Sequence, residues 1–233
     1  MFENRYANKR VLVTGHTGFK GSWLSVWLLQ LGSEVTGLSM PPPTEPSLFN
    51  KLGLAERINH IIGDIRDLTT VQSAINASQP DYVFHLAAQP LVRLSYEQPV
   101  ETNSTNIMGT VNVLEALRLA KKACTAIMIT TDKCYENREC IYSYRENDAM
   151  GGYDPYSSSK GAAELLIDAY RRSYFSPQTD PSTPFSGVKI ASARAGNVIG
   201  GGDWASDRLV PDCIRALQNG KSIPVRNKLA TRP

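Results

Sequence analysis

Two short groups of residues in this sequence carry side chains suited to moving protons. The first is Thr130-Thr131-Asp132-Lys133, which follows an apolar run at 125–129 that is typical of a buried strand. The second is Tyr156 and Lys160, which share one face if their segment is helical, because they are four residues apart. A phenol, two amines, a hydroxyl and a carboxylate favour an enzyme that combines proton transfer with hydride transfer.

Each of these side chains has an expected task and an inert alternative. Lys160 would hold the nicotinamide ribose and lower the pKa of the Tyr156 phenol, so that Tyr156 acts as a base near neutral pH. For Lys133 to act as a base, its pKa must fall from about 10.4 towards 7, at a cost of about 4 kcal/mol, while the pKa of Asp132 must shift upwards. The alternatives are a surface Tyr–Lys pair and two adjacent charges without chemistry.

A glycine-rich segment, Gly15-His16-Thr17-Gly18-Phe19-Lys20-Gly21, directly follows a predicted strand at 10–14 and opens a predicted helix at 19–31. Glycines in this context allow a tight turn and let the backbone approach a pyrophosphate at the helix N-terminus. The spacing is GxxGxxG, and the alternative is a plain glycine turn. The candidate cofactor-binding residues are Gly15, Thr17, Gly18, Phe19 and Gly21.

The residues after the second predicted strand favour NAD over NADP. Ser39-Met40-Pro41 supplies no acidic residue for a ribose hydroxyl, but no arginine lies between Arg10 and Arg57 to bind a 2′-phosphate. Asp64 contacts the adenine amino group or merely caps a helix, for which Asp67 is the better candidate. Further candidates for cofactor contacts are Asp64, Ile65, Leu86, Ala87, Ala88, Gln89, Tyr156 and Lys160.

The elements that must position these residues alternate along the chain. We predict strands at 10–14, 34–38, 81–86, 124–129 and 188–193, and helices at 19–31, 102–119 and 161–170. This alternation predicts an α/β fold with a Rossmann-like, doubly wound parallel sheet and part of a smaller substrate-binding domain. We expect a NAD-binding and catalytic domain at 1–194, and the start of an incomplete substrate-binding domain at 195–233. Ile223-Pro224-Val225 resembles a strand without a later partner, so we expect it to be poorly packed.

Composition excludes several other classes of function. The net charge is +3 and the basic residues are scattered, which argues against nucleic acid as a partner. No stretch approaches the roughly 20 apolar residues that span a membrane, and the first residues lack the apolar core of a signal peptide, so we expect a cytoplasmic protein. The cysteines and histidines show no metal-binding spacing, so we expect no metal; Cys134 should be a reduced, inert thiol and His85 a satisfied core residue.

Taken together, the motifs resemble the extended short-chain dehydrogenase/reductase superfamily and, within it, the CDP-glucose 4,6-dehydratase family. The glycine loop with Ser22-Trp23-Leu24 and the Tyr156–Lys160 pair carry the broader resemblance. The narrower one rests on residues 42–49 and 208–212, on Thr131-Asp132-Lys133-Cys134-Tyr135, and on the run from Arg194 to Trp204 with its Gly-Gly-Gly-Asp-Trp.

This resemblance implies NAD-dependent 4,6-dehydration of a nucleotide-sugar, namely CDP-glucose, in deoxysugar biosynthesis such as that of lipopolysaccharide O-antigen. Tyr156 would take the proton of the sugar 4-hydroxyl while Thr131 bonds the C4 oxygen. Lys133 would then remove the C5 proton and Asp132 would protonate the departing 6-hydroxyl.

The resemblance also implies substrate contacts and a possible homodimer. Asn197, Arg208 and Arg232 would contact the nucleotide-sugar, and the helices at 102–119 and 161–170 could form a four-helix dimer contact. The alternatives are another nucleotide-sugar 4,6-dehydratase or epimerase, or a NAD-binding module without turnover.

Overall fold

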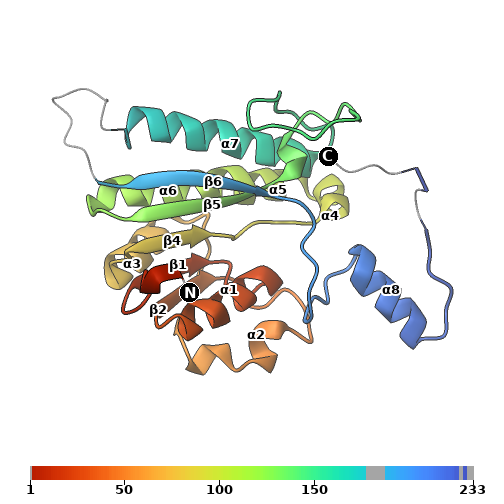
Figure 1. Ribbon diagram of the computed structural model, residues 1–233, viewed down its shortest axis with the longest axis horizontal. Helices are drawn as coiled ribbons and strands as arrows, with labels where there is room; N and C mark the ends of the chain where they lie inside the picture. The colour runs from red at the N-terminus through yellow and green to blue at the C-terminus, as the bar shows by residue number, and fades with distance from the viewer. Residues whose placement is uncertain (1, 177–186, 226–227, 230–233) are drawn as a thin grey trace.

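A single parallel sheet of six strands forms the centre of the molecule (Figure 1). The computed structural model describes residues 2–176, 187–225 and 228–229. The strands are β1 (Arg10–Thr14), β2 (Glu34–Ser39), β3 (Asn59–Ile62), β4 (Tyr82–His85), β5 (Thr125–Thr131) and β6 (Lys189–Ala195). Their order in the sheet is β3-β2-β1-β4-β5-β6, and every pair is parallel. The predicted Rossmann-like class is therefore confirmed.

Helices connect the strands and flank the sheet. The α-helices are α1 (Phe19–Gln30), α2 (Leu48–Lys51), α3 (Leu68–Ser78), α4 (Val92–Glu97), α5 (Pro99–Asn103), α6 (Gly109–Ala120), α7 (Pro155–Ser173) and α8 (Leu209–Gln218). The short turns are η1 (Phe2–Asn4), η2 (Leu54–Glu56), η3 (Ser104–Met108) and η4 (Asp132–Cys134), of which η3 is a π-helical turn between α5 and α6.

The predicted elements agree with the structure except at two points that matter for the site. Each predicted strand lies within two residues of an observed one, and β5 continues through Thr131. The predicted helix at 161–170 in fact begins at Pro155, so that Tyr156 and Lys160 lie on it. The predicted helix at 102–119 is α5, η3 and α6 in succession.

Local chemistry explains where the helices begin and end. Asp67 caps α3 by accepting from the Thr69 amide at 2.9 Å, and Asp154 caps α7 by accepting from the Ser157 amide at 2.9 Å. Pro155 then occupies the first turn of α7, where its missing N–H costs nothing. Helix α1 ends before Gly32, whose φ of +82° suits glycine.

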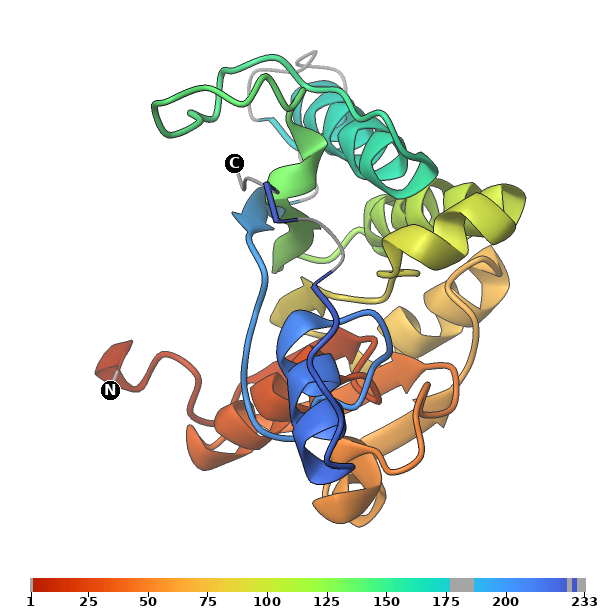
Figure 2. The ribbon, with the colours of Figure 1, turned by 90° about the vertical axis from the view of Figure 1, so that its right-hand side faces the viewer.

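Apolar side chains bury both faces of the sheet. On one face, Leu12, Val83 and Met128 belong to a buried cluster that includes residues of α3, α6 and α7. On the other face, Val11, Val13 and Val35 pack with Leu28 of α1. Figure 2 shows α6 and α7 on one side of the sheet and α1 on the other. Coverage of both faces explains the near-continuous apolar runs of these strands.

Beyond β6 the chain leaves the sheet and leads to α8, which stands apart from the other helices (Figure 1). The indole Nε1 of Trp23 donates to the Gly201 carbonyl at 2.9 Å, which attaches this segment to α1. No residue of α8 is buried. Among the described residues, Ile223 and Val225 lie outside any strand with 40% and 64% of their surface exposed, as expected for a poorly packed segment.

Within the described parts of the chain, no helix is long and apolar enough to cross a membrane. The same residues bring together no group of three or more His, Cys, Asp or Glu side chains that could hold a metal ion.

Candidate active site

The site lies where the carboxyl ends of β1, β4 and β5 meet. Thr14 ends β1 beside His85, which ends β4, and the Thr14 hydroxyl lies 2.7 Å from His85 Nδ1. The Ala87 amide donates to the same hydroxyl at 3.2 Å. The chain turns to opposite sides of the sheet after β1 and β4, and ligands of open α/β sheets bind in the crevice at such a position.

The glycine loop between β1 and α1 has the form that a pyrophosphate requires. A Cβ on Gly15, whose φ is +75°, would lie 2.7 Å from the Ala87 nitrogen, and one on Gly21 would lie 2.2 Å from the Gly15 carbonyl oxygen. Gly18 is the N-cap of α1 and offers no side chain to the first amides of the helix. This tight loop and uncapped helix N-terminus fit the diphosphate of a dinucleotide.

The end of β2 is closed by hydroxyl groups. The Thr17 hydroxyl lies 2.8 Å from the Ser39 hydroxyl and donates to the Met40 carbonyl at 2.9 Å.

Asp64 accepts from the Arg66 amide and guanidinium at 2.8 Å, and these bonds hold the pKa of its carboxyl below the usual value. Because Asp67 caps α3, the capping role considered for Asp64 is wrong.

Thr131, Asp132 and Lys133 lie together where β5 becomes the short turn η4. The Thr131 hydroxyl accepts from the Lys133 amide at 3.4 Å, so it caps η4, and it donates to the Asp132 carboxylate at 2.8 Å. The Thr131 side chain also lowers the pKa of the Tyr156 phenol, so the two side chains are neighbours. The structure therefore brings the two predicted groups of residues close together, although they are separated by more than 20 positions in the sequence.

Burial dominates the electrostatics of the Tyr–Lys pair. Tyr156 and Lys160 are only 8% and 6% exposed. Burial raises the pKa of the Tyr156 phenol, while the Thr131 side chain and the charge of Arg208 oppose it. Burial and the charge of Lys20 lower the pKa of Lys160 to about 8. The expectation that the Tyr156 pKa is lowered is thus wrong for the protein alone, because removal from water outweighs the Thr131 side chain and the charge of Arg208.

A hydrogen-bond chain fixes α7 against the segment after β4. The Gln89 amide donates to Asn106 Oδ1 at 2.8 Å, and Asn106 Nδ2 donates to the Ser159 hydroxyl at 2.9 Å. The Ser95 hydroxyl accepts from the Tyr156 amide at 3.1 Å. The Leu86 amide donates to the Thr14 carbonyl at 3.1 Å, the Ala87 backbone lies against Gly15 of the glycine loop, and Ala88 follows them in the chain.

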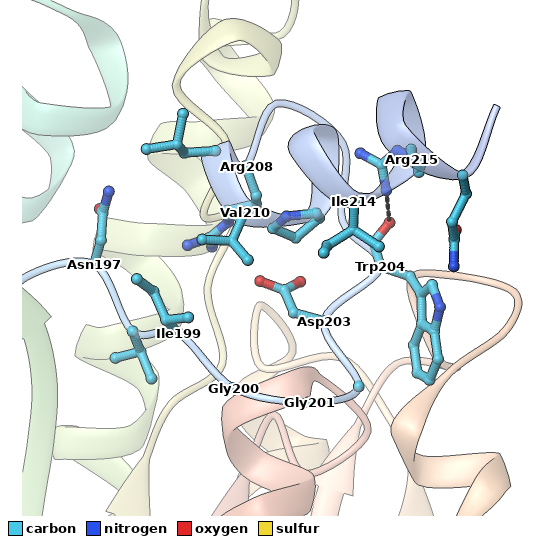
Figure 3. Close-up of a pocket in the computed structure, with 15 residues that line it drawn as sticks. Asn197, Ile199, Gly200, Gly201, Asp203, Trp204, Arg208, Val210, Ile214 and Arg215 are labelled. Carbon is cyan, nitrogen blue, oxygen red and sulfur yellow. Dashed lines mark hydrogen bonds between the residues drawn. The ribbon is translucent and has the colours of Figure 1, made fainter. Parts of the chain in front are cut away.

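Two of the three predicted substrate-binding residues line one cavity. Asn197 and Arg208 belong to the wall of a cavity of about 290 Å³ between the 197–204 segment and α8 (Figure 3). The catalytic candidates do not line this cavity, but the charge of Arg208 acts on both Tyr156 and Lys20. Arg232 lies outside the described residues.

Two further expectations are confirmed. His85 is a satisfied core residue, because it bonds Thr14 and its Nε2 lies 3.2 Å from the Thr110 hydroxyl; burial and Lys160 lower its pKa to about 3. Cys134 is a free, buried thiol whose pKa burial raises to about 11, so it is not reactive.

Sequence reasoning missed several side chains that support the site: Lys20, Ser95, Asn106, Glu164 and Arg194. Glu164 had a readable signal, because it follows Lys160 by one helical turn. The asparagine and the serine gave none, since their partners are distant in sequence.

The sheet order, the glycine loop and the Tyr156–Lys160 pair define a Rossmann-like fold of the short-chain dehydrogenase/reductase class. Residues 12–180 match the family described as GDP-mannose 4,6 dehydratase, and the chain belongs to that family.

Several known proteins resemble this chain in sequence or in structure. The chain is 53% identical to a CDP-glucose 4,6-dehydratase of Salmonella typhimurium over 99% of its own length and 64% of that protein. It resembles the structure of MoeE5 in complex with UDP-glucuronic acid and NAD (27% identity, TM-score 0.70, 88% of this chain and 60% of that one). It also resembles a UDP-N-acetylglucosamine 4-epimerase of Methanobrevibacter ruminantium (25% identity, TM-score 0.76, 93% and 64%). The chain thus spans less than two thirds of the length of each of these proteins.

Proposed function

We propose that this chain carries the NAD-binding and catalytic part of a nucleotide-sugar 4,6-dehydratase that converts CDP-D-glucose to CDP-4-dehydro-6-deoxy-D-glucose. The observation that carries this proposal is the proximity of two groups, Thr131-Asp132-Lys133 at the end of β5 and Tyr156 on α7. The 53% identity to a protein of that name supports the choice of reaction and of substrate. Residues 1–194 would form the NAD-binding domain, and 195–233 would begin the substrate-binding domain.

NAD fits the site described above. Gly15, Gly18 and Gly21, with the N-terminus of α1, would hold its diphosphate. The rest of the cofactor would be lined by Thr17, Phe19, Asp64, Ile65, residues 86–89 and the Tyr156–Lys160 pair. When bound, NAD would supply reversible hydride transfer from and to the sugar within one turnover. The sequence around Ser39 has no arginine between Arg10 and Arg57, which favours NAD over NADP, so calorimetry should show tighter binding of NAD⁺.

Tyr156 begins the reaction by taking the proton of the sugar 4-hydroxyl. Thr131 donates to Asp132 and lies near this phenol, so it can orient the phenol and the C4 oxygen together. The Lys160 ammonium, with a pKa of about 8, is mostly charged at pH 7.5 and would hold the nicotinamide ribose. Arg208 and Thr131 favour the phenolate, which offsets part of the effect of burial.

Asp132 and Lys133 perform the elimination. The 4-keto group acidifies the C5–H bond, Lys133 removes that proton, and Asp132 gives a proton to the 6-hydroxyl, which leaves as water. Sugar epimerases use the Tyr–Lys pair but need no acid–base pair for elimination. The presence of Asp132 and Lys133 beside Tyr156 therefore favours a dehydratase over an epimerase.

The proposal also covers the substrate contacts, the oligomeric state and the cellular setting. Asn197 and Arg208, which line one cavity, and Arg232 would bind the nucleotide part of the substrate. A homodimer could form through the helices at 102–119 and 161–170, the second of which lies within α7. The setting we propose is deoxysugar biosynthesis in the cytoplasm, as in the assembly of lipopolysaccharide O-antigen.

The test is incubation of the NAD-loaded chain with CDP-, UDP-, GDP- and dTDP-glucose in separate reactions. The 4-keto product absorbs in alkali, so each reaction can be read directly. We expect product from CDP-glucose ahead of the other three. NAD⁺ binding without turnover of any of them would instead identify the chain as a NAD-binding module.

A further inference from the structure

A buried carboxylate on α7 has no part in the mechanism above. Tyr156, Lys160 and Glu164 follow one another at intervals of four residues, so they share one face of the helix. Glu164 is the most buried of the three, with 3% of its surface exposed, against 8% for Tyr156 and 6% for Lys160. A carboxylate removed from water to this degree requires partners.

Donors from two neighbouring strands hold the Glu164 carboxylate. One oxygen accepts a hydrogen bond from the hydroxyl of Thr130 on β5. The other accepts from the Ser192 hydroxyl at 3.0 Å and from Arg194 Nη2 at 3.1 Å, both on β6. Three donors in fixed elements leave this carboxylate little freedom to move, and they connect α7 to the strand that ends at Thr131.

The guanidinium of Arg194 is itself fixed. Its Nη1 donates to the Tyr135 hydroxyl at 2.9 Å and to the Glu146 carbonyl at 3.0 Å, and its Cζ lies 4.9 Å from the centre of the Tyr135 ring. The Arg194 side chain is only 14% exposed. The pair therefore belongs to a rigid network rather than to a solvated surface.

The charges that face Lys160 are mostly unfavourable to its ammonium. Lys20, at the start of α1, repels it, and Arg208 in turn acts on Lys20. His85 on β4 is neutral at physiological pH, with a pKa of about 3, and the Tyr156 phenol keeps its proton in the protein alone. Burial and Lys20 lower the pKa of Lys160, whereas Glu164 raises it.

We propose that Glu164 is a positioning residue: its fixed negative charge, anchored by Arg194, Ser192 and Thr130, keeps the buried Lys160 ammonium charged beside Tyr156. Its significance for catalysis rests on the proposed function. Its effect on Lys160 is a property of the chain alone and can be measured without a substrate.

The direct experiment follows the titration of Lys160 by NMR, using lysine labelled at Cε and Nζ and the variant Lys160→Arg to assign the signal. Glu164→Gln keeps the size of the side chain and its acceptor oxygen but removes the charge. Glu164 and Lys160 are separated by one helical turn, so we expect the midpoint of the Lys160 titration, called the Lys160 midpoint below, to fall by about one pH unit, from about 8 to about 7. The charged fraction at pH 7.5 would then fall about threefold.

Asp168→Asn is the matched control, because Asp168 lies one turn further along α7 and pairs with Arg171 and Arg172 at the surface. It should leave the Lys160 midpoint within about 0.3 pH units of its original value. An unchanged midpoint in Glu164→Gln, or an equal fall in Asp168→Asn, would overturn the proposal.

A second variant covers the case in which Glu164→Gln does not fold. In Glu164→Met/Arg194→Met the ion pair is replaced by apolar side chains of similar volume, a change that folded proteins commonly tolerate. The Lys160 midpoint should again fall, because Glu164 lies on the same helix face as Lys160; a constant midpoint contradicts the proposal.

Activity then separates this inference from the proposed function. If CDP-glucose is turned over, the pH at half-maximal rate should move together with the Lys160 midpoint while KM for the sugar changes less than about twofold. A lowered midpoint in a chain that turns over no sugar leaves the inference intact and refutes only the proposed function. Normal turnover of CDP-glucose with an unchanged Lys160 midpoint would refute this inference and leave the proposed function intact.

Discussion

Replacing Gly21 by alanine should weaken both the fold and NAD⁺ binding, although alanine is the better helix former. Gly21 lies in the first turn of α1, behind the loop that begins with Gly15. An added Cβ would lie 2.2 Å from the Gly15 carbonyl oxygen and 2.7 Å from the His16 Cα. Ordinary contact at such a position begins at about 3.4 Å, so the loop must retreat by about 1 Å.

Two opposing effects decide the magnitude. Helix propensity favours alanine over glycine by about 1 kcal/mol. Overpacking of this kind costs about 1–3 kcal/mol, and the upper end applies because the opposing atoms are backbone atoms of a tight turn. We therefore expect a net loss of about 2 kcal/mol in the free energy of unfolding. Because the displaced loop would no longer fit the diphosphate, we expect the Kd for NAD⁺ to rise at least about tenfold, or about 1.4 kcal/mol.

Gly161→Ala is the matched control. Gly161 lies inside α7, and a Cβ there would meet the Cys134 carbonyl oxygen at 3.5 Å, an ordinary contact. Only the higher helix propensity of alanine then affects the stability, and we expect a gain of about 1 kcal/mol in the free energy of unfolding. Urea unfolding followed by circular dichroism, with calorimetric titration of NAD⁺, measures both variants. Equal gains in stability for the two, with unchanged NAD⁺ affinity, would refute the reasoning about the loop.

Three other changes have defined outcomes. Tyr156→Phe should abolish NADH formation from CDP-glucose, because no base remains for the 4-hydroxyl; absorbance at 340 nm with unchanged NAD⁺ binding tests this. Lys133→Ala should still form NADH, but product formation should fall by about 10²- to 10⁴-fold. The control is Lys51→Ala, at an exposed lysine, which should turn over normally. Normal product formation in Lys133→Ala would show that Lys133 is an inert charge. The pKa of His85 is about 3 in the folded chain but about 6.5 in the unfolded chain, so lowering the pH from 7 to 5 protonates this residue only when the chain is unfolded. From His85 alone we expect no loss of the free energy of unfolding above about pH 6.5, and a value about 2 kcal/mol lower at pH 5 than at pH 7. Urea unfolding at both pH values should show a smaller loss in His85→Gln, and an equal loss would exclude His85 as the cause.

The sequence was sufficient for those parts of the site that depend on local order. The apolar runs located β1, β4 and β5, and the polar residues that follow them lie at one edge because parallel strands end on the same side. The glycine spacing was equally informative, since the contact between Gly15 and Gly21 involves residues only six positions apart.

The sequence was insufficient where the site depends on distant contacts. Asn106 and Ser159 meet across 53 positions, and Glu164 meets Arg194 across 30, so no local pattern predicts either pair. The pKa of Tyr156 was predicted in the wrong direction for a similar reason. It depends on how completely the phenol is buried, and on Thr131 and Arg208, rather than on its spacing from Lys160.

The most direct test of the central claim is to follow the hydrogen at C4 of the sugar. CDP-glucose carrying deuterium at C4 is incubated in ordinary water with the NAD-loaded chain, and the product is analysed by NMR. A 4,6-dehydratase built on Tyr156, Asp132 and Lys133 predicts that the deuterium appears at C6. Deuterium that stays at C4 in a 6-hydroxyl sugar with altered C4 stereochemistry would indicate epimerisation and contradict the assignment of Asp132 and Lys133 to elimination.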